Sequence, residues 1–167
     1  MFNKLKVQFM KPIDKISLKK VVKSGLLFSI IYGVSFGIVG YISIFIPSFS
    51  FLLVLAFIVG YLLSKKIKSQ QEDGHIVFRL LGVLFFIFSF YLLHSVFYTI
   101  DFLFTPLLTQ KLSYFKYVYE IFNPLNTFGF LWRPWINQIT FLSVFQFILD
   151  ILVFSFSILF VYKNSSF

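Results

Sequence analysis

The chain has no cysteine and very little charge. Without cysteine it can form no disulfide, no Cys-based zinc site, no thiol nucleophile and no thiol lipidation. Charged residues make up 13% of the 167 residues, with six acids and two histidines, so groups for acid–base chemistry or metal binding are few. The H-E-x-x-H and Gly-rich phosphate-loop signatures are absent as well. We therefore expect no enzyme, no cofactor and no bound metal.

What the chain has in abundance is apolar surface. Hydrophobic residues make up 59% of it and aromatic residues 23%, including 27 phenylalanines. Its apolar runs reach about twenty residues, the length that an α-helix needs to cross a bilayer. The pattern predicts an all-α integral membrane protein with four transmembrane helices. Their expected ranges are 24–45, 48–64, 80–100 and 141–162.

The basic residues lie outside these apolar runs and indicate the orientation. Seven precede the first predicted span, four lie between residues 65 and 79, and Lys163 follows the last span. Only Lys111, Lys116 and Arg133 fall on the other side. Because cytoplasmic segments carry the excess of Lys and Arg, both termini are expected in the cytoplasm. Topology thus explains the net charge of +9 without a nucleic-acid partner.

Two segments flank or connect the spans. Residues 1–23 form a basic tail with Phe2, Leu5 and Phe9 at helical spacing, which predicts either a helix on an anionic lipid surface or a solvated tail. Residues 101–140 form a long aromatic-rich outer connection, expected to lie along the outer bilayer surface or to cap the bundle. Residues 163–167 make a short cytoplasmic tail.

Small residues recur every four positions in the first two predicted spans. Such rows let helix backbones approach closely, which is how helices associate in lipid. The short connection at Pro47 predicts that the two helices are antiparallel neighbours. The residues expected to pack in this way are Gly25, Ser29, Gly33 and Gly37 in the first span and Ala56, Gly60 and Ser64 in the second.

The loop between the second and third spans contains Glu72, Asp73 and His75. These residue types bind metals, but three neighbours without a second cluster are more typical of a solvated turn. We therefore interpret this segment as a turn and assign no metal to it.

Polar residues inside the last two spans form two stripes. Asp150 lies near the middle of the fourth span, where a carboxylate costs roughly 2.5–3.5 kcal/mol to insert. Gln146 shares its helical face, while Tyr91, His94, Tyr98 and Asp101 follow one face of the third span. Similar depths suggest that Asp150 faces His94, with Gln146 and Tyr98 completing a buried cluster. The cluster either fixes the docking of the two helices, or handles protons or cations, or leaves Asp150 for a partner's helix.

The segment from Leu55 to Leu62, the Lys65-Lys66 pair and the Gly74 turn resemble a group of small uncharacterised bacterial membrane proteins with a Gly-rich helical hairpin. The resemblance covers about residues 22–95 and implies a bacterial inner-membrane location, but no activity. The function expected is a non-enzymatic interaction subunit or envelope protein, with a membrane-protein partner or a second copy. The alternative is a small oligomeric proton- or cation-linked transporter or channel using the Asp150 and His94 cluster.

Overall fold

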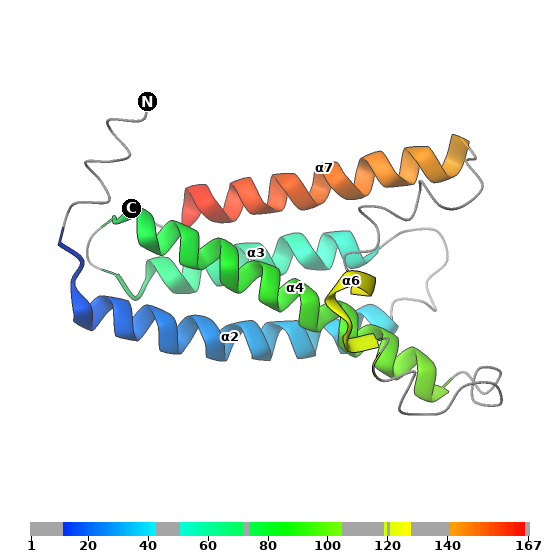
Figure 1. The fold of residues 1–167 in the computed structure, drawn as a ribbon, viewed down its shortest axis with the longest axis horizontal. Coiled ribbons are helices and arrows are strands. Elements are labelled where there is room, and N and C mark those ends of the chain that lie inside the picture. Colours follow the sequence, from blue (N-terminus) through cyan, green and yellow to red (C-terminus); the bar gives the residue numbers. More distant parts are fainter. Residues whose placement is uncertain are drawn as a thin grey trace.

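The computed structural model describes residues 12–42, 51–71, 74–104, 119, 121–127 and 141–165 (Figure 1). These residues form helices and no strands, which confirms the all-α class for this part of the chain. The helices are α2 (Lys15–Ile42), α3 (Phe51–Lys68), α4 (Ile76–Phe104), the short α6 (Pro124–Thr127) and α7 (Phe141–Asn164). The start of α2 and the end of α7 lie at the same end of the bundle (Figure 1).

Helix α2 starts earlier than the sequence pattern predicts, because Asp14 caps it. The Asp14 carboxylate accepts hydrogen bonds from the backbone N–H groups of Ser17 at 2.8 Å and Ile16 at 3.1 Å. The bonds from the Ser17 hydroxyl and from these N–H groups lower the pKa of Asp14 and keep the cap charged. The last nine residues of the predicted tail, from Lys15 to Lys23, are therefore the first turns of α2.

The four long helices form two parallel pairs. The residues of α4 that meet Gly25, Gly33 and Gly37 lie 56 to 60 positions later in the chain, so α2 and α4 run in the same direction. Helix α3 pairs with α7 in the same way, since Phe57 stacks on Phe156 and Tyr61, one turn later, contacts Phe160. The two pairs run in opposite directions, since Gly82 of α4 lies near Val161 of α7 and Phe90 lies near Phe154. The bundle is thus up-down-up-down.

The small-residue row of α2 lies against α4. A Cβ added to Gly33 would be 2.7 Å from the Leu92 Cβ, and one added to Gly37 would be 2.8 Å from the Leu93 carbonyl oxygen. The Ser29 hydroxyl lies 3.1 Å from the Phe85 carbonyl oxygen, and the Ser89 hydroxyl donates to the Ser29 carbonyl at 3.0 Å. Helix backbones can approach this closely only where side chains are minimal.

The row in α3 has other partners, although α3 does contact α2. A Cβ on Gly60 would lie 3.0 Å from Val161 of α7 and 3.3 Å from Phe86 of α4. Ala56 and Ser64 are also buried, each 2% exposed. The row of α2 therefore packs against α4, and Gly60 of the α3 row packs against α7 and α4 and not against the row of α2.

A buried apolar cluster runs through the bundle from α2, α3 and α4. It contains Val21, Leu55, Val59, Leu63, Ile67, Phe78, Phe85 and Leu93. Many other large apolar side chains are exposed on the outside, as in Leu27 of α2 and Leu159 of α7. Residues Lys15–Ile42 and Ile76–Ile100 are each long and apolar enough to cross a membrane. Two such helices are compatible with a membrane protein.

The described part of the long connection folds back along α4. Ile121 is 8% exposed, and the Tyr91 hydroxyl donates a hydrogen bond to the Phe122 carbonyl oxygen. Tyr91 precedes Asp101 by ten positions, about 15 Å along the helix axis. Residues 121–127 thus lie beside the C-terminal half of α4, and their predicted place at the bilayer surface stays a prediction. Residues 105–118 and 128–140 are outside the described part.

Candidate functional site

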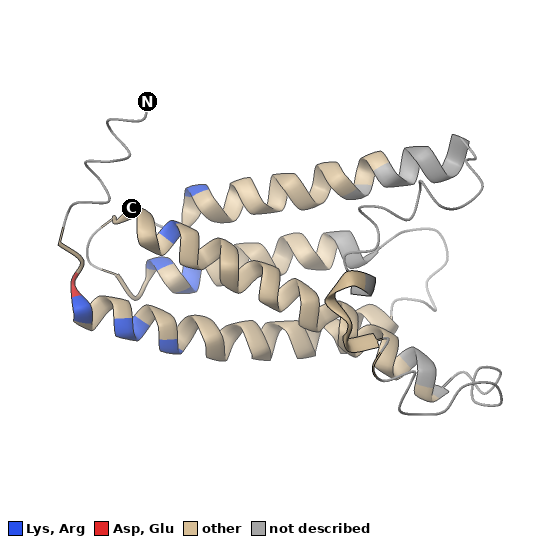
Figure 2. Ribbon diagram, in the orientation of Figure 1, with Lys and Arg blue, Asp and Glu red and all other residues tan. Residues whose placement is uncertain are grey.

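The basic residues of the described chain gather at one end of the bundle (Figure 2). Each of the four long helices has a cation at nearly the same height along the bundle axis, within about one helical turn as the contacts between the helices show. These cations are Lys23 of α2, Lys65 of α3, Arg79 of α4 and Lys163 of α7. Four helices therefore contribute a cation to one layer, which we call the cationic layer. The remaining described cations are Lys15, Lys19 and Lys20 in α2 and Lys66 and Lys68 in α3.

Beyond the cationic layer the helices carry almost no charge. Helix α4 has no Lys, Arg, Asp or Glu between Arg79 and Asp101, a distance of 22 positions or about 33 Å. The hydrocarbon core of a bilayer is about 30 Å thick. The uncharged stretch is therefore about as long as the hydrocarbon core of a bilayer is thick.

Two polar side chains are buried beside the cationic layer. Gln71 and His75, in the connection between α3 and α4, are 5% and 6% exposed. The Gln71 amide donates to the carbonyl of Ser165, which follows α7, and His75 Nδ1 accepts from the Val77 N–H at 3.1 Å. The interpretation of this connection as a solvated turn does not hold for His75, which caps α4 instead. Sequence reasoning missed Gln71 because its partner lies 94 residues away.

The predicted stripe on α4 does not form one cluster among its described side chains. Tyr91 bonds to the outer connection, as described above. His94 packs on Phe90, with ring centroids 4.2 Å apart, and its Nδ1 lies 3.1 Å from the Phe90 carbonyl oxygen. Tyr98 is 41% exposed and meets the edge of Phe97. Each of the three thus has a separate environment.

The structure gives the depth of Asp150 but not its contacts. Contacts between the antiparallel α4 and α7 join residues whose numbers add up to 240–244, as for Phe86 and Phe154 or Gly82 and Val161. Position 150 therefore lies level with positions 90–94 of α4. The side chains of Asp150, Gln146 and Asp101 are outside the described part, so the predicted contact with His94 stays a hypothesis.

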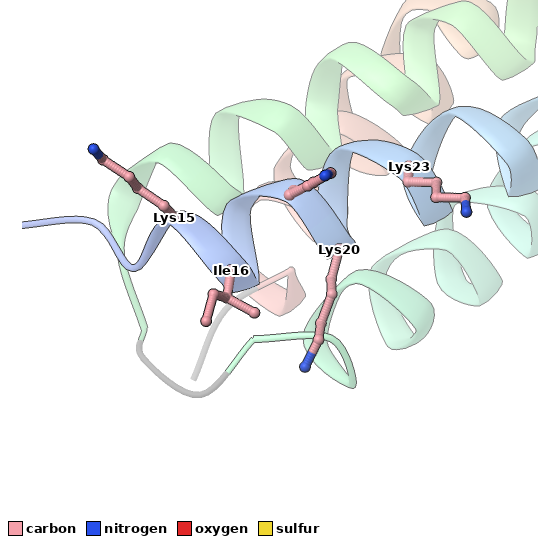
Figure 3. Close-up of a pocket in the computed structure, with 5 residues that line it drawn as sticks. Lys15, Ile16, Lys20 and Lys23 are labelled. Carbon is pink, nitrogen blue, oxygen red and sulfur yellow. The ribbon is translucent and has the colours of Figure 1, made fainter.

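Among the described residues, no group of three His, Cys, Asp or Glu side chains could hold a metal ion. An open pocket is lined by Lys15, Ile16, Lys19, Lys20 and Lys23, at the foot of α2 (Figure 3).

Comparisons with family models, with curated proteins and with solved structures each found no match. Any functional conclusion therefore depends on the geometry of this chain.

Proposed function

We propose that the chain is a four-span integral membrane protein of the bacterial inner membrane, with both termini in the cytoplasm, that acts without catalysis by binding a membrane-protein partner or a second copy. The observation that carries this proposal is the cationic layer at one end of four helices with almost no charge beyond it. Positive charge marks the cytoplasmic face of membrane proteins. In a soluble helical bundle both ends and the outer faces meet water, so charged residues are not confined to one end.

The outer faces of α2 and α7 support the interaction role. Leu27 of α2 is 54% exposed, and Leu152, Phe156 and Leu159 of α7 are 58%, 59% and 65% exposed. Leu152, Phe156 and Leu159 follow steps of four and three, so they form one continuous face of α7. In a bilayer such a face meets either lipid or another helix. A ridge of large side chains offers another helix grooves to pack into.

Photo-crosslinking in native membranes tests the interaction. A photoreactive amino acid at Leu152 or Leu159 is expected to yield one protein adduct of defined mass, identified by mass spectrometry as a partner or a second copy. The same amino acid at Val59, which is fully buried, serves as the control and is expected to crosslink within the chain. If both exposed positions and one on α2, Leu27, yield lipid adducts alone, the interaction role is contradicted.

A transporter or channel is the second candidate, and the outer half of the bundle favours it. Residues 121–127 lie beside Tyr91, at the depth of His94 and of position 150. The helical pieces of this segment are short and broken at Asn123. Broken helices at membrane depth are tolerated where they are buried in protein or line a water-filled cavity. A carboxylate, an imidazole and a re-entrant segment at one depth are the parts of an ion pathway.

The candidate predicts that proteoliposomes containing the protein show a pH-dependent proton or cation flux. Asp150→Asn is expected to abolish the flux, because the amide cannot exchange a proton or balance a cation. Ser155→Ala, a change at an exposed position of the same helix, is the control and should leave the flux unchanged. A flux of wild-type size in Asp150→Asn would contradict this mechanism.

A further inference from the structure

The foot of α2 carries more cations than any other described helix end. Lys15, Lys19, Lys20 and Lys23 are all exposed and, together with Ile16, line the open pocket shown in Figure 3. In that view Ile16 and Lys20 extend to the same side of the helix, and Lys23 lies one turn further along. The last turn of α3 holds three lysines, and the last turn of α7 holds Lys163 alone. The pocket is therefore suited to an anion.

The nearest described acid does not neutralise this pocket. Asp14 precedes Lys15, but its two carboxylate oxygens accept hydrogen bonds from the Ile16 and Ser17 N–H groups. The capped carboxylate keeps its negative charge, which attracts Lys20. Four lysines within nine residues outnumber this one carboxylate, so the pocket keeps a net positive charge.

An apolar strip continues from the lysines along the same face of α2. Leu27, Ile30 and Ile31 follow Lys23 at four, seven and eight positions, and they are 54%, 47% and 43% exposed. From Lys23 to Ile31 the strip rises about 12 Å, close to the roughly 15 Å of one hydrocarbon leaflet. The same helix face therefore offers cations at the level of the headgroups and apolar side chains at the level of the acyl chains.

We propose that this face of α2 holds one anionic phospholipid of the inner leaflet, with its phosphate at Lys20 and Lys23 and its acyl chains along Leu27, Ile30 and Ile31. The inference rests on the proposed membrane topology. It goes further than a general attraction of a basic tail to anionic lipid, because it assigns one lipid to one helix face. Charge complementarity selects the occupant, since a second copy would bring its own four lysines against these.

Native mass spectrometry of the full-length protein in mild detergent tests the site. Dioleoylphosphatidylglycerol and dioleoylphosphatidylcholine are added at equal concentration. One retained phosphatidylglycerol per chain is expected. The double variant Lys20→Gln/Lys23→Gln should bind it about tenfold more weakly, because each lysine near an anionic headgroup contributes substantially to binding. The variant Lys65→Gln/Lys163→Gln removes two exposed cations from the same layer and should retain the lipid as the wild type does.

The other outcomes overturn the proposal in distinct ways. Equal weakening in both double variants would mean a diffuse charge effect and no site. Equal retention of both lipids would mean that the phosphate is not selected. Displacement of the lipid by millimolar glycerol 3-phosphate would mean a site for free phosphates, because a lipid held also by its acyl chains resists that competitor. A dimer that buries the pocket would assign the face to a second copy.

Membrane insertion is measured separately for each variant, by resistance to carbonate extraction. If the wild type is extracted, the proposed function fails whatever the lipid result is. If all variants resist extraction and Lys20→Gln/Lys23→Gln still holds its lipid, the lipid site alone is overturned.

Discussion

Replacement of Gly33 by leucine is expected to lower the free energy of unfolding by about 2 kcal/mol, the usual cost of overpacking a tight interface. A Cβ at this position would lie 2.7 Å from the Leu92 Cβ and 2.8 Å from the Ser89 carbonyl oxygen of α4. Because a backbone atom is one of these neighbours, α2 and α4 must move apart. The Ser89 to Ser29 hydrogen bond between them would be lost as well. Denaturation in mixed micelles by sodium dodecyl sulfate measures the change.

Two matched variants separate packing from helix propensity. Ser35→Leu places the same leucine side chain at an exposed position of α2, two residues away, and should leave the stability within about 0.5 kcal/mol of the wild type. Gly60→Ala brings its Cβ to 3.0 Å from the end of a side chain, Val161, which can adjust, so the gain in helix propensity should offset the crowding. Equal losses in Gly33→Leu and Ser35→Leu would contradict the close approach of α2 to α4.

The second large effect concerns orientation. A variant with seven lysines changed to glutamine reduces the predicted cytoplasmic cations from twelve to five, against three on the outer side. The seven are Lys15, Lys19, Lys20 and Lys23 of α2 and Lys65, Lys66 and Lys68 of α3. This variant is expected to insert in both orientations, because the difference in Lys and Arg that directs insertion is almost removed. Reporter fusions at the C-terminus, one active in the cytoplasm and one in the periplasm, measure the two populations.

Each half of that change serves as a control. Removing the four lysines of α2 leaves eight cytoplasmic cations, and removing the three of α3 leaves nine, so either variant alone should keep the wild-type orientation. A seven-lysine variant that still inserts in one orientation would contradict the role of the cationic layer in topology.

The sequence predicts the helices well where the signal is local. The uncharged stretch from Arg79 to Asp101 and the spacing of Gly25, Gly33 and Gly37 are both legible without a structure. The apolar pattern predicts a span from residue 24, whereas α2 begins at Lys15. The extra residues are basic, so the apolar pattern does not include them, but lysine is a good helix former. The Asp14 cap decides where the helix begins.

Features that depend on distant residues could not be predicted in this way. A glycine row indicates close packing but not its partner, and α4 fits the row because Ser89 and Leu92 present a backbone carbonyl and a side chain there. Likewise, Gln71 and His75 look like turn residues, and it is packing against other parts of the chain that buries them. The register of α4 and α7 puts position 150 level with positions 90–94, and the contact between Asp150 and His94 stays a prediction.

Cysteine labelling of intact cells tests the proposed topology most directly, because the wild type has no cysteine to give a background signal. Single cysteines replace Ser69, between α3 and α4, Ser113, between α4 and α7, and Lys163, at the end of α7. A membrane-impermeant maleimide is expected to label Ser113→Cys in intact cells, and Ser69→Cys and Lys163→Cys after permeabilisation alone. Labelling of Ser69→Cys or Lys163→Cys in intact cells, or no labelling of Ser113→Cys there, would contradict a four-span protein with both termini in the cytoplasm.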